Sequence, residues 1–509
     1  MNERTIGDLW AQLYGDERVE LTGLVEHLKS LKEAASPGAA FPTQGLVYST
    51  YADAFGDGLD GVRAQLPRLK GLGVTVLWLL PLLDSPDRDQ GFDIRDYTQV
   101  SPRFGGNAAL RRLVTASRDL GIALVFDVAV NHTSDQHPWF RAALDPKSPY
   151  HDFYYWSSTA QEYADAPLIF PGMVDSNWTW YPEAGAWNFH RFYPFQPDLN
   201  YRNPRVASQM SQMLADWKAF GIDGFRMDAA ALLWKEEGTD CENLPQVHVI
   251  LKLFQACLDF VSPGSLLLAE ANVATEGLVE YFGQGDECKA AYHFELMPQF
   301  YKALVTRNPR PLAEAKFPAL PPHCAWFTFL RLHDEVTLDL AAPDDRLSLV
   351  RAYTKSPEAI FRPNRAFSGR LFDLLDRDPQ KVLAAWSLLV SLPGTPILYY
   401  GDEIGMENNH EYFEAKSAET GFRDSRFLHR GPWDSARACR AQEGVGPEAQ
   451  VKAGLDRLLG LRRDHPELAA STPQLTVEGS RLTSVRRHGG RTLTLVTDLA
   501  DFRCDWKVD

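Results

Sequence analysis

Short apolar runs alternate with amphipathic segments along most of this chain. Runs of this length predict buried strands, whereas the segments between them, such as residues 60–72 and 107–120, repeat apolar residues at helical spacing. Eight runs follow one another: GLVYSTY, VTVLWLL, ALVFDVAV, GFRMD, SLLLAE, AAYHFEL, AWFTFLRL and PILYYGDE. Eight strands that alternate with helices over several hundred residues favour a (β/α)8 barrel over an open sheet.

The two ends of the chain depart from this alternation. Residues 1–44 show helical periodicity, for example at Leu9 and Leu13, up to the helix-breaking Ser36-Pro37-Gly38. They predict a helical N-terminal extension. Residues 471–509 alternate polar and apolar positions and predict a short C-terminal β domain.

Two stretches between the predicted strands are too long for ordinary loops. Residues 134–203 follow the third strand and predict an insertion subdomain, which is rich in aromatic residues. Residues 337–378 follow the seventh strand and predict a smaller insertion. The barrel itself is then expected in residues 45–133, 204–336 and 379–470.

Composition narrows the class of protein. The chain has 509 residues, 45% of them hydrophobic, which is enough for one large core. A net charge of −15 argues against nucleic acid or an anionic membrane as the partner. We expect a cytoplasmic protein, because the N-terminus lacks an apolar signal region and no stretch approaches the roughly 18 apolar residues of a membrane span. The six cysteines form no CxxC pair, so they signal neither a zinc site nor a disulfide framework.

Four predicted strands end in acidic, basic or histidine residues, and in a barrel these ends meet at one rim. Cleavage of a glycosidic bond with retention needs a nucleophilic carboxylate and a carboxylic acid about 5–5.5 Å apart. Asp228 and Glu270 are the candidates. Arg226 lies two residues before Asp228, on the same face of the strand, where its charge favours an ionised nucleophile. Glu270 follows an apolar strand, and partial desolvation raises the pKa of such an acid.

The strand ends DVAVNH, GFRMD, LLLAE and RLHD, in this order, resemble the four signature segments of the α-amylase superfamily, glycoside hydrolase family 13. The match covers nearly the whole barrel. It implies that Asp228 is the nucleophile and Glu270 the acid/base. It also implies that Asp334, preceded by His333, hydrogen-bonds sugar hydroxyls as charge develops on the ring, and that His132 does similar work.

Within that family the chain has features of two groups. The segment GTDCENLPQVH at residues 238–248 looks like one shared by amylosucrases and trehalose synthases, which act on small α-glucosides. The N-terminal extension, YFGQGDEC, DSRFLHR and FQPDLNY resemble amylosucrase or sucrose hydrolase types, and FQPDLNY implies that Phe195 lies near the leaving-group side. DQGFDI and Glu335 directly after Asp334 resemble trehalose synthases or α-glucosidases.

The resemblance also suggests a closed pocket. In exo-acting relatives an Asp after the second strand pairs with a late Arg behind the non-reducing glucose, and Asp89 and Arg430 match these positions. Such a pocket would admit one glucosyl unit. A solvated turn at Asp89 and a helix-capping Arg430 remain the alternative. Phe92 stands where relatives carry a stacking Tyr.

A metal site is weighed because many relatives bind calcium. Residues 53–60 are rich in Asp, but Phe55 occupies a position that should supply an oxygen ligand. We therefore expect no required metal, and the chemistry needs no organic cofactor.

These residues predict a retaining α-glucosidase or transglucosidase that acts on small α-glucosides, sucrose or similar, with a sugar or water as acceptor. Two departures leave the donor open: amylosucrases carry Asp where Glu335 stands, and trehalose synthases carry Asn where Leu332 stands. One alternative is a trehalose synthase-like maltose/trehalose isomerase or maltose-active α-glucosidase. The other is a catalytically inactive carbohydrate-binding subunit, but such subunits usually lose catalytic carboxylates that are present here.

Overall fold

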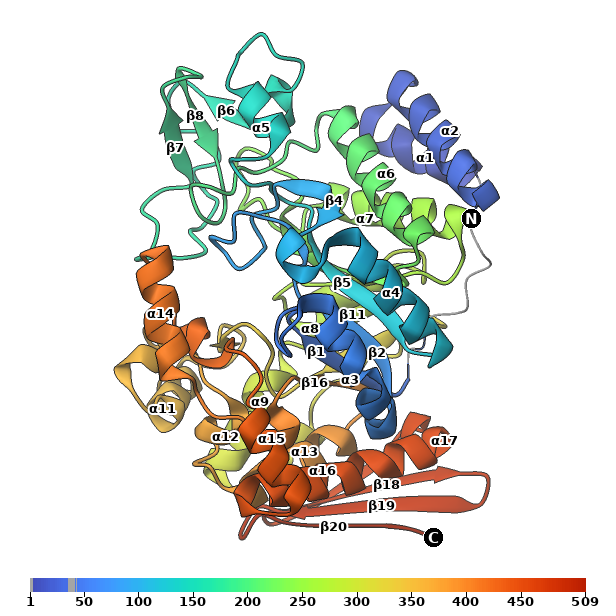
Figure 1. Ribbon diagram of the computed structural model, residues 1–509, viewed down its shortest axis with the longest axis vertical. Coiled ribbons are helices and arrows are strands. Elements are labelled where there is room, and N and C mark those ends of the chain that lie inside the picture. Colours follow the sequence, from blue (N-terminus) through green and yellow to red (C-terminus); the bar gives the residue numbers. More distant parts are fainter. Residues whose placement is uncertain (1–2, 35–41, 43) are drawn as a thin grey trace.

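The eight apolar runs form the strands of one closed barrel. The computed structural model describes residues 3–34, 42 and 44–509, and its barrel strands run parallel, each beside the next in sequence (Figure 1). They are β1 (Leu46–Thr50), β2 (Val74–Leu79), β5 (Ala123–Ala129), β9 (Gly224–Asp228), β10 (Leu266–Ala269), β11 (Ala290–Tyr292), β12 (Ala325–Thr328) and β16 (Thr395–Tyr399). The (β/α)8 prediction is confirmed. The expected helix break at Ser36-Pro37-Gly38 lies outside the described residues.

Helices surround the barrel and follow the strands in turn (Figure 1). After β10 the connection holds only the short segments α8 (Thr275–Leu278) and η4 (Val279–Phe282). The longer helices are α3 (Gly58–Leu72), α4 (Gly106–Asp119), α6 (Pro204–Phe220), α7 (Pro245–Val261), α9 (Leu296–Thr306), α13 (Pro379–Ser391) and α16 (Gly446–Asp464).

The sequence marks the ends of these helices clearly, as α6 shows. The side chain of Asn203 accepts a hydrogen bond from the backbone N–H of Arg205, and Pro204 occupies the first helical position. The helix ends at Gly221, whose φ of 119° favours glycine.

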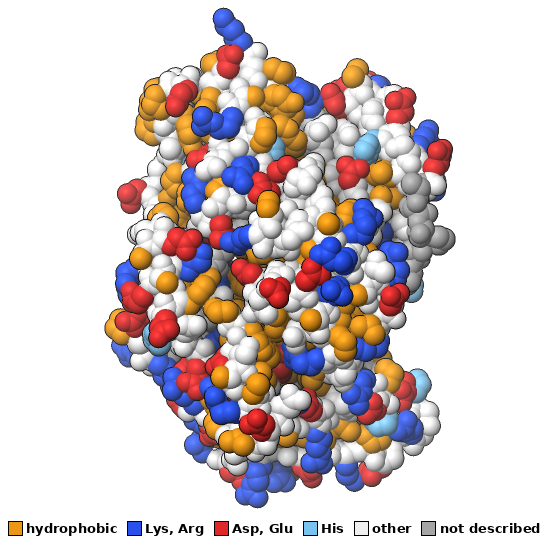
Figure 2. All heavy atoms as spheres, in the orientation of Figure 1, with side chains coloured by type: hydrophobic (Ala, Val, Ile, Leu, Met, Phe, Trp, Pro, Cys, Tyr) orange, Lys and Arg blue, Asp and Glu red, His pale blue; other side chains and the backbone are white. Residues whose placement is uncertain are grey.

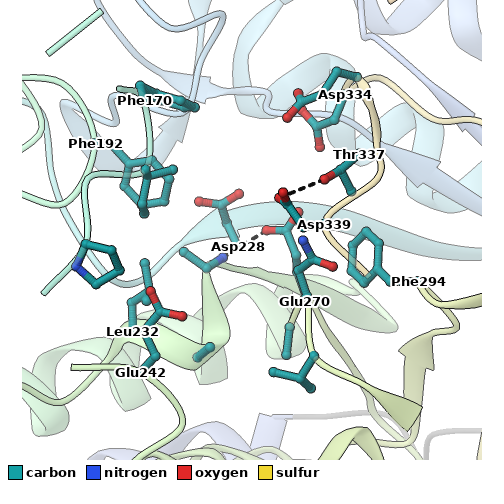
Figure 3. Close-up of a pocket in the computed structure, with 18 of the residues that line it drawn as sticks. Phe170, Phe192, Asp228, Leu232, Glu242, Glu270, Phe294, Asp334, Thr337 and Asp339 are labelled. Atoms are coloured by element: carbon teal, nitrogen blue, oxygen red, sulfur yellow. Dashed lines mark hydrogen bonds between the residues drawn. The ribbon is translucent and has the colours of Figure 1, made fainter. Parts of the chain in front are cut away.

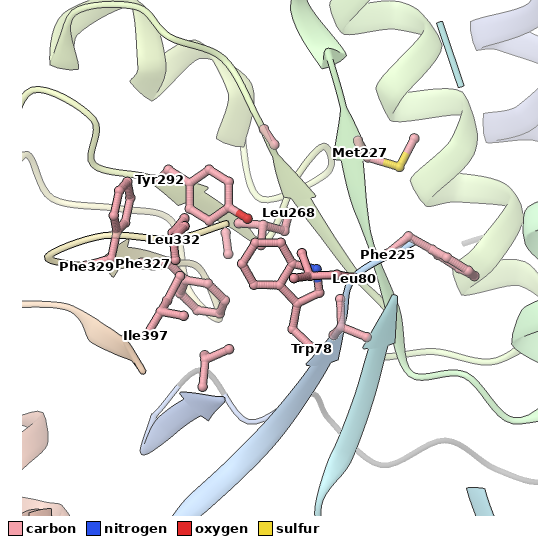
Figure 4. Packing of buried hydrophobic residues seen from close by; sticks show 14 of the residues in the cluster. Trp78, Leu80, Phe225, Met227, Leu268, Tyr292, Phe327, Phe329, Leu332 and Ile397 are labelled. Atoms are coloured by element: carbon pink, nitrogen blue, oxygen red, sulfur yellow. The ribbon is translucent and has the colours of Figure 1, made fainter. Parts of the chain in front are cut away.

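Large apolar side chains from several strands fill the barrel interior. Trp78 of β2 lies beside Tyr292 of β11, with ring centroids 5.8 Å apart, near Leu268 and Phe327 (Figure 4). The indole N–H of the fully buried Trp78 donates to Asp127 Oδ2 at 3.0 Å. The core therefore holds the buried carboxylate of Asp127, a residue of β5, in place.

The N-terminal extension is a pair of helices, α1 (Glu3–Tyr14) and α2 (Val19–Ala34). They lie against α7 and α6 on the outside of the barrel (Figure 1). Trp10 is completely buried in this contact, and the ammonium group of Lys32 lies 4.4 Å from the centroid of the Phe260 ring. The phenol of Tyr14 donates to the backbone carbonyl of Tyr201 at 2.8 Å.

Each long connection carries a small antiparallel sheet. The connection after β5 holds α5 (Pro138–Ala143) and a sheet of β6 (Trp156–Ser157), β8 (Ala186–Phe189) and β7 (Trp178–Tyr181). The connection after β12 holds α11 (Pro343–Tyr353) and a sheet of β13 (Val336–Thr337), β15 (Ala366–Phe367) and β14 (Ile360–Arg362).

The C-terminal β domain is a four-stranded antiparallel sheet, as the alternating pattern predicts. Its strands are β17 (Gln474–Glu478), β18 (Arg481–His488), β19 (Arg491–Asp498) and β20 (Arg503–Val508). It packs on α13, where the hydroxyl of Ser484 donates to the carbonyl of Ser391 at 2.9 Å.

Acidic and basic side chains are interspersed on the surface in Figure 2. Within the described ranges, no helix combines the length and apolar character needed to cross a bilayer. All six cysteines are free.

Candidate active site

A cavity of about 420 Å³ opens at the carboxyl ends of the barrel strands. Its wall combines strand ends with residues of both insertions (Figure 3). Of the residues predicted from sequence, those on the wall are Asp89, Phe92, His132, Asp228, Glu270, Asp334 and Glu335. Arg226, His333 and Arg430 lie behind the wall and contact it, whereas Phe195 lies apart from it.

Arg226 forms the base of the site. Its Nη1 lies 2.7 Å from Asp127 Oδ1 and 2.6 Å from Asp228 Oδ1. Its Nη2 contacts Glu270 and lies 3.8 Å from Asp334 Oδ2. Arg226 and Asp228 do share one face of β9, as their spacing predicts, and one buried guanidinium group thus faces four carboxylates.

The two candidate catalytic carboxylates differ in their surroundings. Glu270 Oε2 accepts a hydrogen bond from the backbone N–H of Ala229 at 3.0 Å. Burial raises the pKa of Glu270 to about 8, although Arg226 opposes this shift. Burial also raises the pKa of Asp228 to about 7, again against Arg226 and helped by the negative charge of Asp127. Arg226 therefore limits the rise for Asp228 without lowering its pKa to the usual value.

The pKa of Asp334 is shifted in the opposite direction. Its Oδ1 lies 3.1 Å from Arg430 and 3.5 Å from Arg426, and its Oδ2 lies 3.2 Å from His333 Nε2. Burial alone would raise the pKa of Asp334, but His333 and the surrounding guanidinium groups hold it well below its usual range. Asp334 is therefore the most firmly ionised carboxylate of the site.

The predicted pairing of Asp89 with Arg430 is wrong, because Arg426 takes that place. Asp89 Oδ1 lies 3.7 Å from Arg426 Nη2, and Asp89 Oδ2 accepts from Gln196 Nε2 at 3.0 Å. Arg430 instead donates to Gln90 Oε1 at 2.7 Å and to the carbonyl of His333 at 2.8 Å.

The path of the segment η7 (Ser425–His429) explains this difference. Asp424 caps η7 and contacts the Arg426 guanidinium group at 2.6 Å, which holds that side chain on the pocket wall. Arg430 follows η7 and turns beneath the rim. Both arginines belong to the string DSRFLHR, so spacing alone could not choose between them.

Of the remaining predicted contact residues, Phe92 and His132 line the pocket and Phe195 does not. Phe92 lines the pocket and stacks on His333, with centroids 5.6 Å apart. His132 also lines it, and burial lowers its pKa to about 4, so the imidazole is neutral at physiological pH. Phe195 is not on the wall: it stacks on Tyr193 at 5.1 Å beneath the guanidinium group of Arg88 at 4.2 Å.

Comparison with known proteins agrees with this geometry. A family model described as "Alpha amylase, catalytic domain" matches residues 44–320. The chain belongs to the α-amylase family. The named relatives in this family include a trehalose synthase/amylase and a palatinase.

Several relatives in this family are trehalose synthases. The trehalose synthase/amylase TreS of Mycolicibacterium smegmatis is 44% identical over 366 residues, which cover 70% of this chain and 61% of that protein. The trehalose synthase of Thermus thermophilus is 37% identical over 474 residues, which cover 88% of this chain and 48% of that protein. The matched region thus spans about half to two thirds of these curated relatives.

Solved structures share the fold of this chain. The sucrose 6F-phosphate phosphorylase of Thermoanaerobacter thermosaccharolyticum superimposes with a TM-score of 0.78 at 18% identity, covering 92% of this chain and 95% of that one. The α-glucosyl transfer enzyme XgtA gives a TM-score of 0.68 at 23% identity, covering 91% and 92% of the two chains.

Oxygen atoms surround the ammonium group of Lys235, which follows η3 (Ala230–Leu232). Lys235 Nζ lies 2.8 Å from both Asn131 Oδ1 and Asp198 Oδ2, and it also contacts the carbonyl of Leu232. Its ammonium group supplies the positive charge among these oxygen atoms.

The Asp-rich string 53–60, weighed above as a calcium site, has an ion pair: Asp60 pairs with Arg112. Metal-binding groups of three or more His, Cys, Asp or Glu are absent from the part of the chain that is described.

Several wall residues were not singled out from the sequence. They lie at no end of a barrel strand and come from insertions or long connections, where periodicity gives no guide: Phe170, Phe192, Glu242, Asn243, Asp339, Arg362 and Arg426. The strings ENLP and DSRFLHR contain three of them, and these strings were the available signal.

Proposed function

We propose that this protein is a retaining α-glucosidase or transglucosidase that forms a covalent β-glucosyl-enzyme on Asp228. The observation that carries the proposal is the contact of one guanidinium group, Arg226, with both Asp228 and Glu270. Sharing one guanidinium group keeps two carboxylates close, in keeping with the separation of about 5–5.5 Å used for retention rather than the wider one used for inversion.

The pKa order supports the division of roles. Glu270, with a pKa of about 8, is protonated at neutral pH and can protonate the glycosidic oxygen while Asp228 attacks the anomeric carbon. In the second step the Glu270 carboxylate removes the proton of the acceptor hydroxyl, which displaces Asp228. The firmly ionised Asp334 hydrogen-bonds sugar hydroxyls and stabilises the positive charge of the transition state.

The closed end of the pocket supports action on the terminal glucosyl unit. Asp89, Arg426 and Gln196 form a polar barrier beyond the catalytic carboxylates. Hydroxyl groups at the non-reducing end can hydrogen-bond to this barrier, while the aromatic faces of Phe92 and Phe192 contact the sugar ring. A small α-glucoside fits such a site better than the interior of a polymer.

Interconversion of maltose and trehalose is the reaction that we propose first. Trehalose synthases share 44% and 37% identity with this chain, and Glu335 directly follows Asp334, as in the trehalose synthase or α-glucosidase resemblance. Sucrose, the donor expected first from the sequence, becomes the second candidate. Amylosucrases carry Asp at the position of Glu335, whereas in this chain Glu335 pairs with Arg362.

The test is incubation with maltose, trehalose and sucrose in separate reactions, with every sugar quantified over time. We expect trehalose to form from maltose and maltose from trehalose, with little free glucose. Fructose release from sucrose without any trehalose would instead support the sucrose reading. The Asp228→Asn variant provides the blank, because it lacks the nucleophile.

A further inference from the structure

Residues 233–244, the segment between η3 (Ala230–Leu232) and α7, place Glu242 and Asn243 on the pocket wall, where neither has a role in the chemistry above. In Figure 3, Glu242 of this segment and Asp334 lie on opposite sides of Asp228. Two residues of the segment, Cys241 with φ 58° and Asn243 with φ 53°, have left-handed backbones, which are unfavourable for non-glycine residues. Such backbones persist where the surroundings impose them, and they cluster at binding sites.

Asn243 has a fixed orientation. Its Oδ1 accepts a hydrogen bond from the phenol of Tyr281 at 2.5 Å, and its backbone N–H donates to the carbonyl of Ala231 at 2.9 Å. Burial raises the pKa of Tyr281, so the phenol remains a donor. Because Oδ1 is occupied, the amide N–H₂ group is the part left to act, and it has no partner among the described residues.

Tyr281 is itself held in place. Its side chain is buried, and its ring packs edge-on against His248, with centroids 4.8 Å apart. His248 Nδ1 lies 2.8 Å from the buried carboxylate of Glu287. Tyr281, His248 and Glu287 are not on the pocket wall, and Tyr281 contacts the wall through Asn243.

Glu242 is also held in place, by an ion pair with a buried arginine. Its Oε1 lies 2.6 Å from Nη2 of Arg191, a completely buried residue of the insertion after β5. Arg191 also donates to the carbonyls of Asp240 and Cys241, which fixes the backbone of the segment. Glu242 Oε2 makes no hydrogen bond within the described ranges, and about a third of the side chain, 32%, is exposed.

We propose that Asn243 and Glu242 bind hydroxyl groups of the leaving sugar, which is also the acceptor in a transfer reaction, and that Tyr281 is the positioning residue for Asn243. The pair offers one donor and one acceptor, which match the hydroxyls of a neutral hexose. The glucosyl unit occupies the end closed by Asp89, so the pair serves the second sugar. This inference rests on the proposed function and deepens it.

Two variants test the pair without changing the catalytic carboxylates. Asn243→Asp keeps a residue that tolerates the left-handed backbone but replaces the donor amide by acceptors. Tyr281→Phe keeps the ring against His248 and removes only the hydroxyl group. Tyr14→Phe is the matched control, because it removes a half-buried phenol of α1, outside the barrel, that donates to the backbone carbonyl of Tyr201. Thermal unfolding establishes that each variant folds.

Activity is measured on two donors. Maltose needs the second-sugar contacts, whereas α-glucosyl fluoride has a leaving group that makes none of them. We expect both variants to lose about tenfold or more in kcat/KM on maltose, as for a lost hydrogen bond to substrate. On α-glucosyl fluoride they should keep their kcat/KM, which covers only the steps up to formation of the glucosyl-enzyme. Equal losses on both donors, or no loss on maltose, would overturn the inference.

Binding separates this inference from the proposed function. In the Asp228→Asn background, calorimetry with maltose and with glucose is compared for the parent and for Asn243→Asp. Weaker maltose binding with unchanged glucose binding supports the pair even if the parent chain proves inactive on maltose. Unchanged maltose binding, or no maltose binding by the Asp228→Asn parent, would refute it.

Discussion

At the scale of single residues, burial and charge give three carboxylates of the pocket different pKa values. Burial raises the pKa of Asp228 and Glu270, and a cluster of guanidinium groups lowers that of Asp334. Strand-end positions predicted this convergence, since alternation along β9 fixes where Arg226 and Asp228 point. The partner of Asp89 could not be predicted, because it depends on the path of η7 rather than on any period.

The pKa order predicts a bell-shaped pH profile. In the proposed mechanism Asp228 acts as an anion, so kcat/KM should rise as pH passes its pKa of about 7. Glu270 acts there as an acid, so kcat/KM should fall as pH passes its pKa of about 8. With α-glucosyl fluoride, which needs little protonation, the loss at high pH should shrink. A profile that keeps rising beyond pH 9 on maltose would contradict the role of Glu270.

The contact of Asp89 with Arg426 predicts energetic coupling. In a double-mutant cycle with Asp89→Asn and Arg426→Gln, measured by kcat/KM on maltose, we expect a coupling energy of about 0.5–3 kcal/mol. The matching cycle with Arg430→Gln should show a smaller value, because Arg430 contacts Gln90 and Asp334 instead. Stronger coupling of Asp89 to Arg430 would restore the pairing first expected from the sequence.

At the scale of elements, the insertion after β5 is tied to the barrel by buried charges. Asp198 of the insertion contacts Lys235, which follows η3, and both side chains are completely buried. The sequence predicted that this insertion exists from its length, but not these contacts, because no periodicity relates residues of two separate loops. The eight strands were predictable since each is a short buried run.

Removal of the Lys235 ammonium group should destabilise the protein. Lys235→Met leaves Asp198 buried without its cation, and we expect the free energy of unfolding to fall by about 3–5 kcal/mol. Chemical denaturation measures the change. The double variant Lys235→Met with Asp198→Asn should recover part of the loss, and a single variant as stable as the parent would show that the pair contributes nothing.

At the scale of the whole molecule, one barrel carries three kinds of addition (Figure 1). The N-terminal helices lie on its flank, the two insertions lie at its rim, and the C-terminal sheet packs on α13. The rim additions shape the pocket, whereas the N-terminal helices cover α6 and α7, away from the pocket wall. Periodicity predicted both terminal additions, since their helices and strands each bury one face. The contacts between these additions and the barrel could not be predicted from the sequence, because they join residues far apart in the chain.

The N-terminal helices should contribute stability rather than catalysis. Trp10→Ala removes a completely buried side chain, and we expect a loss of about 3–5 kcal/mol in the free energy of unfolding. Val19→Ala, at a position that is 79% exposed, is the control and should change little. The kcat/KM of folded Trp10→Ala should match the parent; a selective loss of activity would connect this extension to the site.

The most direct test of the central claim is capture of the glucosyl-enzyme. Glu270→Gln is mixed with α-glucosyl fluoride, which reacts without an acid, while removal of the Glu270 base slows the second step. We predict an intact mass raised by one glucosyl unit, with peptide mapping that places it on Asp228. Turnover of the fluoride without any adduct, or an adduct on another residue, would contradict the assignment of Asp228 as the nucleophile.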